Sequence, residues 1–424
     1  MADSRRVLIV GSGGREHALA WKLQQSPGIS ALFCLPGNAG TAAVATNLEG
    51  VPSDHSTILR AVQEQAIDLV VIGPDDCLAA GLADDLQRAG IAAFGPTQSA
   101  ARLESSKVFA KAFMERHGIP TAQAGIFDDP ASARAFADSQ NLPLVIKAEG
   151  LALGKGVIIA ETRAAVAAAI HQIMVDKAFG TAGERVVIEE FLTGQECSIH
   201  AFISEGRYQL CPAAQDHKRI GEGDIGPNTG GMGTCCPTPV VDGAAMARIE
   251  EEVIKPFVSG CQEEGIDFRG MLFPGLMMTA EGPKVLEFNC RFGDPEAQVL
   301  VRLLESDLLP LLEATIEGTL DTIKPEWSSS TAICIVMASG GYPGSYGKGY
   351  PISGIATAEA LDSVVVFHAG TKAIDGEPVT SGGRVLGVTA LGRTLSTARE
   401  AAYSATATIH FEGCQYRRDL PTGR

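Results

Sequence analysis

The sequence predicts a multidomain protein of the α/β and α+β classes, with a doubly wound parallel sheet at its N-terminus. Three observations lead to this fold class. Short apolar runs alternate with helical patterns over residues 5–95, which is typical of parallel sheets. Alternating, β-branched segments at residues 196–213 and 271–288 favour an antiparallel sheet. Residues 331–424 are again rich in strand patterns, with one late helix around 394–410.

Composition limits the classes of function. The chain has 424 residues, enough for two to four domains, and 45% of them are hydrophobic, as in globular proteins. Its net charge of −16 gives no general attraction to nucleic acid or to anionic membranes. We find no signal-peptide pattern and no apolar run of membrane-spanning length, so we expect a cytoplasmic protein. None of the ten cysteines forms a CxxC pair, which favours buried, reduced thiols over a zinc site.

The predicted elements follow the apolar runs. The first unit contains buried strands near residues 6–10, 31–35, 67–73 and 91–96, and a boundary at the Gly-Pro pair 95–96. A helix is predicted over 99–117, since Pro120 stops the pattern. Strands near 144–147, 157–160 and 186–189 form a smaller α/β unit, a loop covers 215–234, and a helix covers 305–316. Residues 325–330 are interpreted as a linker.

Two glycine-rich segments are candidates for binding phosphate. Residues 11–17, GSGGREH, lie between a predicted strand and a helix, where backbone amides and the helix N-terminus attract anions. The third glycine of a dinucleotide fingerprint is missing, so a simple tight turn is the alternative. Residues 147–157, KAEGLALGKGV, combine glycines with Lys147 and Lys155, which can neutralise a polyphosphate. This segment is not a Walker A loop, and a solvated hairpin is its alternative.

Two later segments add acids and cations. Asp216 begins an unusually long run of glycine, proline and polar residues at 215–233, which predicts a mobile loop that closes over an anionic substrate. Glu287 and Asn289 are two positions apart on a predicted strand and therefore share a face, with Arg291 on the same side. Such oxygen ligands suit Mg²⁺ or Mn²⁺ on ATP phosphates, and the arginine suits a carboxylate. A structural cluster of ion pairs is the alternative.

Together these segments resemble the glycinamide ribonucleotide synthetase family, the phosphoribosylamine–glycine ligases of the ATP-grasp superfamily. The resemblance covers almost the whole chain, and the order and spacing of its motifs are specific. The motifs that carry it are GSGGREHAL (11–19), PGNAGT (36–41), LESSKVFAK (103–111), IKAEGLALGKGVIIA (146–160), VIEEFLTGQECS (187–198), QDHKRIGEGDIGPNTGGMG (215–233), LEFNCRFGDPEAQ (286–298), GYPGSYGKG (341–349), HAGT (368–371) and GGRVLGVTA (382–390).

The resemblance implies a Rossmann-like N-terminal substrate domain (1–103), an ATP-grasp domain (104–325) with an inserted lid at about 124–191, and a C-terminal domain (326–424). It implies that ATP drives the joining of glycine to 5-phosphoribosylamine through glycyl phosphate, in purine biosynthesis, with Mg²⁺ or Mn²⁺. It also implies a monomer or weak homodimer and a transient contact with the amidotransferase that makes the amine.

The resemblance assigns roles to particular residues. Glu287 and Asn289 would hold the metal, and Arg291, Asp216 and Lys155 would act in catalysis, with Arg291 and Asp216 placing glycine. The nucleotide would contact Lys107, Lys147, Gly154, Lys155, Glu189, Glu190, Leu192 and Glu196. Phosphoribosylamine would contact Gly13, Gly14, Arg15 and Glu16.

Departures and alternatives remain open at this stage. The family usually has aspartate at the positions of Glu149 and Glu222, and alanine at that of Pro274, which we therefore expect at an edge or a bulge. One alternative is an ATP-grasp ligase with other substrates. Another is a nicotinamide-dependent oxidoreductase, which would need an acidic ribose ligand that the second strand does not offer. The third is a non-catalytic nucleotide-binding protein, which the intact lysines, Glu287, Asn289 and Arg291 argue against.

Overall fold

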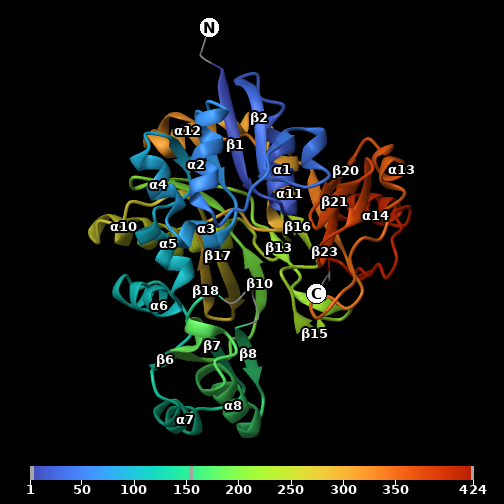
Figure 1. Cartoon of the computed structure of the whole chain (residues 1–424). Coiled ribbons are helices and arrows are strands. Elements are labelled where there is room, and N and C mark those ends of the chain that lie inside the picture. The colour runs from blue at the N-terminus through green and yellow to red at the C-terminus, as the bar shows by residue number, and fades with distance from the viewer. Residues whose placement is uncertain (1–3, 152–155, 422–424) are drawn as a thin grey trace.

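The computed structural model describes residues 4–151 and 156–421 of the chain (Figure 1). In the view of Figure 1 the N-terminal sheet lies at the top, a central sheet in the middle, a small lid at the bottom and the C-terminal unit at one side. None of the described helices is long and apolar enough to cross a bilayer.

The N-terminal unit is the parallel sheet that the sequence predicts. Its strand order is β3-β2-β1-β4-β5, and every neighbouring pair runs parallel. The chain reverses its winding direction beside β1, so a crevice opens at the carboxyl end of β1, where residues 11–14 lie. The elements are β1 (Arg5–Gly11), α1 (Gly14–Leu23), β2 (Ile29–Pro36), β3 (Thr46–Asn47), α2 (His55–Glu64), β4 (Leu69–Ile72), α3 (Asp75–Ala79), α4 (Leu82–Arg88) and β5 (Ala92–Phe94).

The predicted helix over 99–117 is two helices in the structure, α5 (Gln98–Ser105) and α6 (Lys107–Arg116). Ser106 interrupts them with an extended backbone, and its hydroxyl accepts a hydrogen bond from the amide of Phe109 at 3.1 Å. The sequence pattern missed this break because serine caps a helix as readily as it continues one. The break directs Lys107, at the start of α6, toward Glu149 and Gly150.

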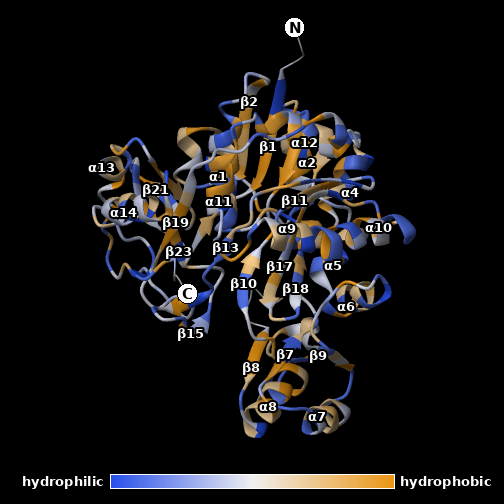
Figure 2. Ribbon diagram, turned by 180° about the vertical axis from the view of Figure 1, so that it is seen from behind, coloured by the Kyte–Doolittle hydropathy of each residue, from blue (hydrophilic) through white to orange (hydrophobic). Residues whose placement is uncertain are grey.

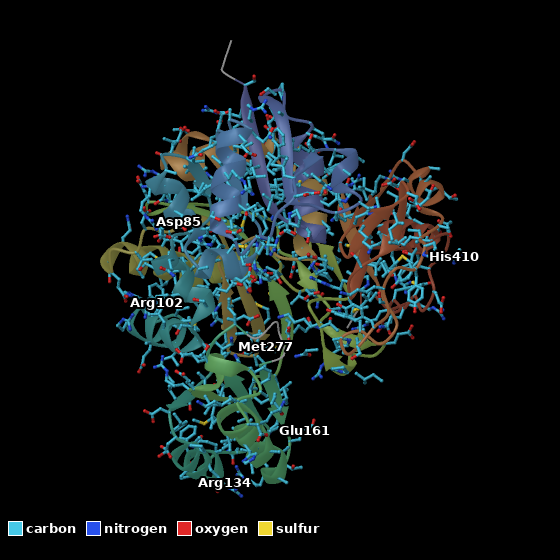
Figure 3. All side chains as sticks on the ribbon, in the orientation of Figure 1. Asp85, Arg102, Arg134, Glu161, Met277 and His410 are labelled. Atoms are coloured by element: carbon cyan, nitrogen blue, oxygen red, sulfur yellow. The ribbon has the colours of Figure 1, made fainter. Side chains whose placement is uncertain are left out.

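The lid is a four-stranded sheet in the order β6-β9-β7-β8, with antiparallel pairing throughout. Two alanine-rich helices, α7 and α8, pack on one face, and Arg134 and Glu161 mark this part of the molecule in Figure 3. The elements are β6 (Ala124–Phe127), α7 (Pro130–Ser139), β7 (Leu144–Ala148), β8 (Val157–Ala160), α8 (Arg163–Ile170) and β9 (Val186–Glu190).

The central sheet is antiparallel, as expected, and is built around the long strand β17 (Arg269–Thr279). Pro274 lies in β17 where the neighbour on one side changes from β10 to β11, one residue before a register shift against β18. Proline is tolerated there because the ladder is already interrupted. The other elements are β10 (Gln195–Ser198), β11 (Ala201–Ser204), β12 (Arg207–Leu210), α9 (Gly243–Ile249), α10 (Lys255–Glu263), β18 (Gly282–Asn289), α11 (Glu296–Leu303) and α12 (Leu308–Glu317).

The region 215–234, predicted as a loop, contains four short strands. β13 (Gln215–Asp216) and β16 (Gly233–Cys236) extend the C-terminal sheet, whose order is β13-β16-β19-β23-β20. Between them β14 (Arg219–Gly221) and β15 (Ile225–Asn228) form a hairpin of their own. Glycine-rich composition hid these strands, and β16 also pairs with β19, which is distant in the sequence. The C-terminal unit also contains β19 (Thr331–Ala338), α13 (Ile355–Glu359), β20 (Val364–His368), β21 (Thr371–Ile374), β22 (Glu377–Thr380), β23 (Arg384–Gly392) and α14 (Leu395–Thr406).

Hydrophobic side chains fill the layers between these sheets and helices. Figure 2 shows the apolar colour concentrated on β1, β17 and α11, inside the molecule. One core cluster joins the N-terminal sheet, α11, α12 and β19, so the N-terminal, central and C-terminal units share a continuous interior. All ten cysteines are free thiols, nine of them buried, as the composition predicted.

Candidate active site

Two lysines come together where the lid approaches the central sheet. Lys147, on the lid strand β7, reaches across to β18 and donates a hydrogen bond to the carbonyl of Leu286 at 3.0 Å. Lys107, at the start of α6, donates to the carbonyl of Gly150 at 3.3 Å. Burial lowers the pKa of Lys107, although Glu287 opposes this effect. Both ammonium groups therefore lie where the lid meets the central sheet and α6, in a position to neutralise phosphate charge.

Glu189 lies beneath Lys147 and does not point freely into a ribose site. Its carboxylate is 2.7 Å from the Nζ atom of Lys147 and 2.8 Å from that of Lys111. Burial raises the pKa of Glu189, but Lys147 and Lys111 lower it by more than burial raises it, so the net shift of this pKa is downward. The sequence did not single out Lys111, which is buried on α6 and also donates to Thr121 at 2.7 Å. This buried triad fixes the orientation of Lys147.

The segment after β9 contains the other predicted nucleotide contacts. Glu190 accepts a hydrogen bond from the amide of Gln123 at 3.0 Å. This bond joins the end of β9 to the segment between α6 and β6. Leu192 is buried, whereas the side chain of Glu196 is 46% exposed and faces Lys218 at 3.8 Å. Met277 pairs with Glu196 across β10 and β17, and Figure 3 labels it at this junction.

Glu287 and Asn289, at the end of β18, fit a magnesium ion. The pKa of Glu287 is raised by burial but lowered more strongly by Lys218, Lys107 and Lys147, so the carboxylate is ionised. The Asn289 side-chain oxygen points to the guanidinium of Arg291 at 2.9 Å. No group of three or more His, Cys, Asp or Glu residues suited to a metal ion occurs in the described parts of the chain. One carboxylate and one amide leave most coordination positions for phosphate oxygens and water, as Mg²⁺ prefers.

Arg291 is held as a rigid binding group. Its guanidinium lies 3.0 Å from the carboxylate of Glu104 and donates to the carbonyl of Phe292 at 3.3 Å. Its Nε atom is buried and has no hydrogen-bond partner among the described residues. A buried, unpaired donor on a fixed guanidinium is what a bound carboxylate would satisfy. Glu104 was not predicted, although it lies within the LESSK motif.

Asp216 and Glu296 form a second, acidic end of the site. Burial raises the pKa of Asp216, and the neighbouring Glu296 raises it further. One carboxylate oxygen of Asp216 is buried without a hydrogen-bond partner in the parts of the chain that the structure describes, and Glu296 accepts a hydrogen bond from Ser198 at 3.3 Å. Lys218 lowers the pKa of both acids by its charge, and its own pKa is lowered by burial but raised more by Glu196 and Glu287. Two buried acids with an unsatisfied oxygen favour a cationic ligand, such as an ammonium group.

Gly231 determines how closely the backbone approaches Asp216. Its φ is +115°, and an ideal Cβ atom there would lie 2.5 Å from an Asp216 carboxylate oxygen. We expect Gly231→Ala to displace Asp216 and to raise the KM for the amino-acid substrate by roughly tenfold, equivalent to about 1.4 kcal/mol of binding free energy. Steady-state kinetics with varied amino acid measure this.

The matched control is Gly376→Ala, which shares a positive φ of +84° but has open space around the new methyl group. Its KM should equal that of the parent protein. Equal KM values for Gly231→Ala and Gly376→Ala would exclude Asp216 as a determinant of amino-acid binding.

The first glycine-rich segment lines a separate pocket of about 330 Å³ at the crevice beside β1. Glu16 accepts a hydrogen bond from the amide of Gly13 at 2.6 Å and pairs with Arg15 at 2.7 Å. Arg15 also donates to the carbonyl of Phe292 at 3.1 Å, and its own amide donates to Asp294 at 3.3 Å. The pocket is lined by Gly11, Ser12, Gly13, Arg15, Glu16, Val51, Pro52, Ser53, Pro74, Asp76 and Asp294.

The structure thus brings most of the predicted site residues either into the pocket beside β1 or into the charged cluster between the lid and β18. Gly14 is the first residue of α1, next to the N-cap residue Gly13. Gly154 and Lys155 lie outside the described residues. Lys218, Asp294 and Glu296 were missed, although they stand in the motifs QDHKR and FGDPE, and only the folded chain shows that they face the site. Glu149 pairs with Arg185, and one of its oxygens accepts from Ser106 at 2.9 Å, which accommodates its longer side chain.

Comparison with known proteins gives one consistent family. Residues 5–104, 105–297 and 332–422 match the N, ATP-grasp (A) and C domains of phosphoribosylglycinamide synthetase. The chain is 50% identical to a phosphoribosylamine–glycine ligase of Agrobacterium fabrum over 416 residues, 98% of this chain and 97% of that protein. It is 51% identical to the trifunctional purine biosynthetic protein adenosine-3 of Gallus gallus but spans only 42% of that protein's length.

Solved structures agree with these sequence relatives. A phosphoribosylamine–glycine ligase from Thermotoga maritima superposes with a TM-score of 0.85 at 35% identity, covering 98% of this chain and 99% of that one. A biotin carboxylase domain from Hydrogenobacter thermophilus, solved with MgADP, shares the fold with a TM-score of 0.74 at 15% identity, over 98% of this chain and 92% of that one.

A lid with facing lysines over a strand that ends in a carboxylate and an amide defines an ATP-grasp ligase, an enzyme class that uses ATP with Mg²⁺. Within that class, the chain belongs to the phosphoribosylglycinamide synthetase family, the phosphoribosylamine–glycine ligases of purine biosynthesis.

Proposed function

We propose that this chain joins glycine to 5-phosphoribosylamine at the expense of ATP, through glycyl phosphate, and releases glycinamide ribonucleotide, ADP and phosphate. One observation carries this proposal. The segment from Glu287 to Glu296 runs from the candidate metal ligands, past Arg291, to the carbonyl of Phe292 and the carboxylate of Asp294, which both contact Arg15. Sites for the nucleotide, a carboxylate and an amine are therefore adjacent along one short stretch of chain.

The first half-reaction would activate glycine. Arg291 would bind the glycine carboxylate through its free Nε donor, while Asp216 and Glu296 would hold the ammonium group. Lys147, Lys107 and Lys155 would contact ATP phosphates, and Glu287 and Asn289 would hold Mg²⁺ or Mn²⁺, which balances phosphate charge when bound. A carboxylate oxygen of glycine would then attack the γ-phosphorus of ATP, the bond from that phosphorus to the bridging oxygen would break, and ADP would leave. The new acyl phosphate has a good leaving group, which free glycine lacks.

The second half-reaction would form the amide. The amine of phosphoribosylamine, placed by Gly13, Gly14, Arg15 and Glu16, attacks the acyl carbon, phosphate leaves, and the amine loses a proton. Because Arg15 is anchored to Phe292, the amine pocket and the carboxylate site hold a fixed separation. Positioning and charge neutralisation account for the rate enhancement, and no covalent bond to the protein is needed.

We also propose that the three domains divide this work. Residues 1–103 would bind the amine substrate, and residues 104–325 would bind ATP, with residues 124–191 as the lid. Residues 326–424 would complete the amine pocket through Arg384, which donates to the carbonyl of Asp294 at 2.7 Å. Glu189, Glu190, Leu192, Glu196 and Gly154 would lie along the nucleotide.

An assay of the purified protein tests this function. ATP, Mg²⁺, glycine and freshly prepared phosphoribosylamine are supplied, and ADP and glycinamide ribonucleotide are followed together. We expect ADP release to require both glycine and the amine. Bicarbonate or alanine in place of glycine should give only background. ADP release that ignores glycine, or that is supported by bicarbonate, would assign the chain to a different reaction.

A further inference from the structure

The hairpin β14–β15 lies next to the candidate active site in sequence. Among the described residues its two strands pair with each other and with no other strand, and Ile225, the first residue of β15, is 67% exposed. Asp216 and Lys218 come directly before it in the chain. An isolated two-stranded hairpin is marginally stable at best. Some other part of the protein must therefore hold this hairpin if those two side chains are to keep their places.

Arg417 provides that hold. Its side chain is almost fully buried, at 1% exposure, and it donates to the carbonyl of Arg219 at 3.1 Å and to the carboxylate of Asp224 at 2.6 Å. Asp419 binds the same guanidinium at 2.9 and 2.7 Å and accepts from the amide of Gly223 at 2.8 Å. Figure 1 shows β15 beside the C-terminal end of the chain. Arg417 and Asp419 thus bind both the first strand and the turn of the hairpin.

The grip is anchored to the body of the C-terminal unit. Tyr403, on α14, donates to the carbonyl of Arg417 at 2.9 Å and accepts from the amide of Leu420 at 3.0 Å. Arg399, one turn earlier, donates to the carbonyls of Leu420 and Arg418, both at 2.9 Å. Four hydrogen bonds therefore fix residues 417–420 to helix α14, independently of their contacts with the hairpin.

The turn of the hairpin is built for this contact. Asp224 has a φ of +58°, a left-handed conformation that costs free energy in a non-glycine residue and persists where surrounding contacts compensate. Glu222, one of the two departures from the usual acidic pattern, accepts a hydrogen bond from the amide of Arg418 at 3.2 Å. Hydrogen bonds to Arg417 lower the pKa of Asp419 to about 2, so this pair stays charged throughout the neutral range.

The contact reaches the reaction centre through Lys218. The residue that Arg417 holds by its carbonyl, Arg219, is the next one along the chain. The carbonyl of Lys218 accepts hydrogen bonds from the amide and hydroxyl of Thr229, both at 2.8 Å, which tie it to the far end of the hairpin. The ammonium group of Lys218 lies 3.8 Å from the carboxylates of both Glu196 and Glu287.

We propose that Arg417 is a positioning residue of the ligase: by clamping the hairpin it sets Lys218 beside Glu287, the candidate metal carboxylate. This inference rests on the proposed function, since it assigns Glu287 to the metal. Arg417 touches no reacting atom. A guanidinium suits the task because Arg417 donates four hydrogen bonds from its fixed plane, to a carbonyl and two carboxylates, whereas a lysine ammonium group has three donors on one atom.

The test compares Arg417→Ala and Arg417→Lys with Arg418→Ala. Arg418 is the matched control, because its exposed side chain lies over the ring of Tyr416, and its hydrogen bond to Glu222 comes from the backbone amide, which alanine keeps. We expect both Arg417 variants to lower kcat roughly tenfold and to raise the Mg²⁺ concentration for half-maximal rate several-fold, while the KM for ATP stays within about twofold. Arg418→Ala should match the parent protein in all three values.

Trypsin cleavage at Lys218 or Arg219 reports the hairpin directly. We expect cleavage of folded Arg417→Ala to be at least about fivefold faster than that of Arg418→Ala. Adding Asp224→Asn to Arg417→Ala should cost no further kcat, because both changes break one contact. Unchanged cleavage and Mg²⁺ dependence, or a fall in kcat that only follows the folded fraction, would overturn the proposal.

The cleavage result also separates the two proposals. A parent protein without glycine-dependent ADP release would overturn the proposed function, and with it the catalytic part of this inference. The trypsin comparison would still decide whether Arg417 holds the hairpin.

Discussion

Replacing Glu287 with glutamine is expected to lower kcat by roughly a hundredfold or more, which corresponds to at least about 2.7 kcal/mol in activation free energy. The amide has the same shape as the carboxylate but no charge, so it binds Mg²⁺ weakly and leaves Lys218 with one fewer anionic partner. Steady-state ADP release measures the loss. Raising Mg²⁺ should restore part of the rate, because the defect is one of metal affinity.

Glu281→Gln is the control for this experiment. Glu281 lies at the turn between β17 and β18, and its side chain is 79% exposed and pairs with Lys284 at 3.1 Å. We expect normal kinetics, since an exposed ion pair contributes little. Circular dichroism should show both variants folded. A Glu287→Gln protein with near-normal turnover would remove this residue from the metal site.

Replacing Arg291 with lysine is expected to raise the KM for glycine by roughly a hundredfold, equivalent to about 2.7 kcal/mol. The guanidinium presents separate donors to Glu104, Asn289 and Phe292 and still keeps Nε free. A lysine ammonium group cannot keep these contacts and also bind a carboxylate in two places. The KM for ATP should change far less, because the adenine side of the site is untouched.

Arg116→Lys tests whether an arginine that binds a carboxylate elsewhere on the molecule would give the same result; the side chain of Arg116 is 47% exposed. Arg116 binds Glu264 through two nitrogens at 2.8 and 2.9 Å, on the outer side of α6. Its replacement should leave the KM for glycine unchanged. If Arg291→Lys also binds glycine normally while ATP binding weakens, Arg291 contacts the nucleotide rather than the amino acid.

Much of the fold follows from local sequence. Buried runs such as residues 7–10 and 69–72 predict parallel strands, because a strand covered on both faces must be apolar along its whole length. Glu287 and Asn289 were predicted to share a face, since side chains alternate along a strand. The family motifs, in their order, then supplied the reaction and the substrates.

Local sequence did not give the partners of the charged groups. It did not show that the carboxylate of Glu189 contacts Lys111 and Lys147 from two other elements. It missed Glu104, which lies 187 positions before Arg291 in the chain and 3.0 Å from it in space. Sequence motifs identify residue types that could take part in a reaction. They do not distinguish a glutamate that binds a ligand from a glutamate that holds a lysine in place, because the residue type is the same.

The hairpin β14–β15 and its contact with Arg417 separate what the sequence predicts from what the folded chain shows. The sequence by itself determined the parallel N-terminal sheet, the strand that places Glu287 and Asn289 on one face, and the family, because periodicity and motif spacing are local properties. Only the tertiary structure decided that residues 215–234 form strands, that Lys218 faces Glu287, and that Arg417 holds them. The contacts of Lys218 with Glu287 and of Arg417 with the hairpin join residues that are distant in sequence, and they exist because burial and charge pairing bring the separate units together.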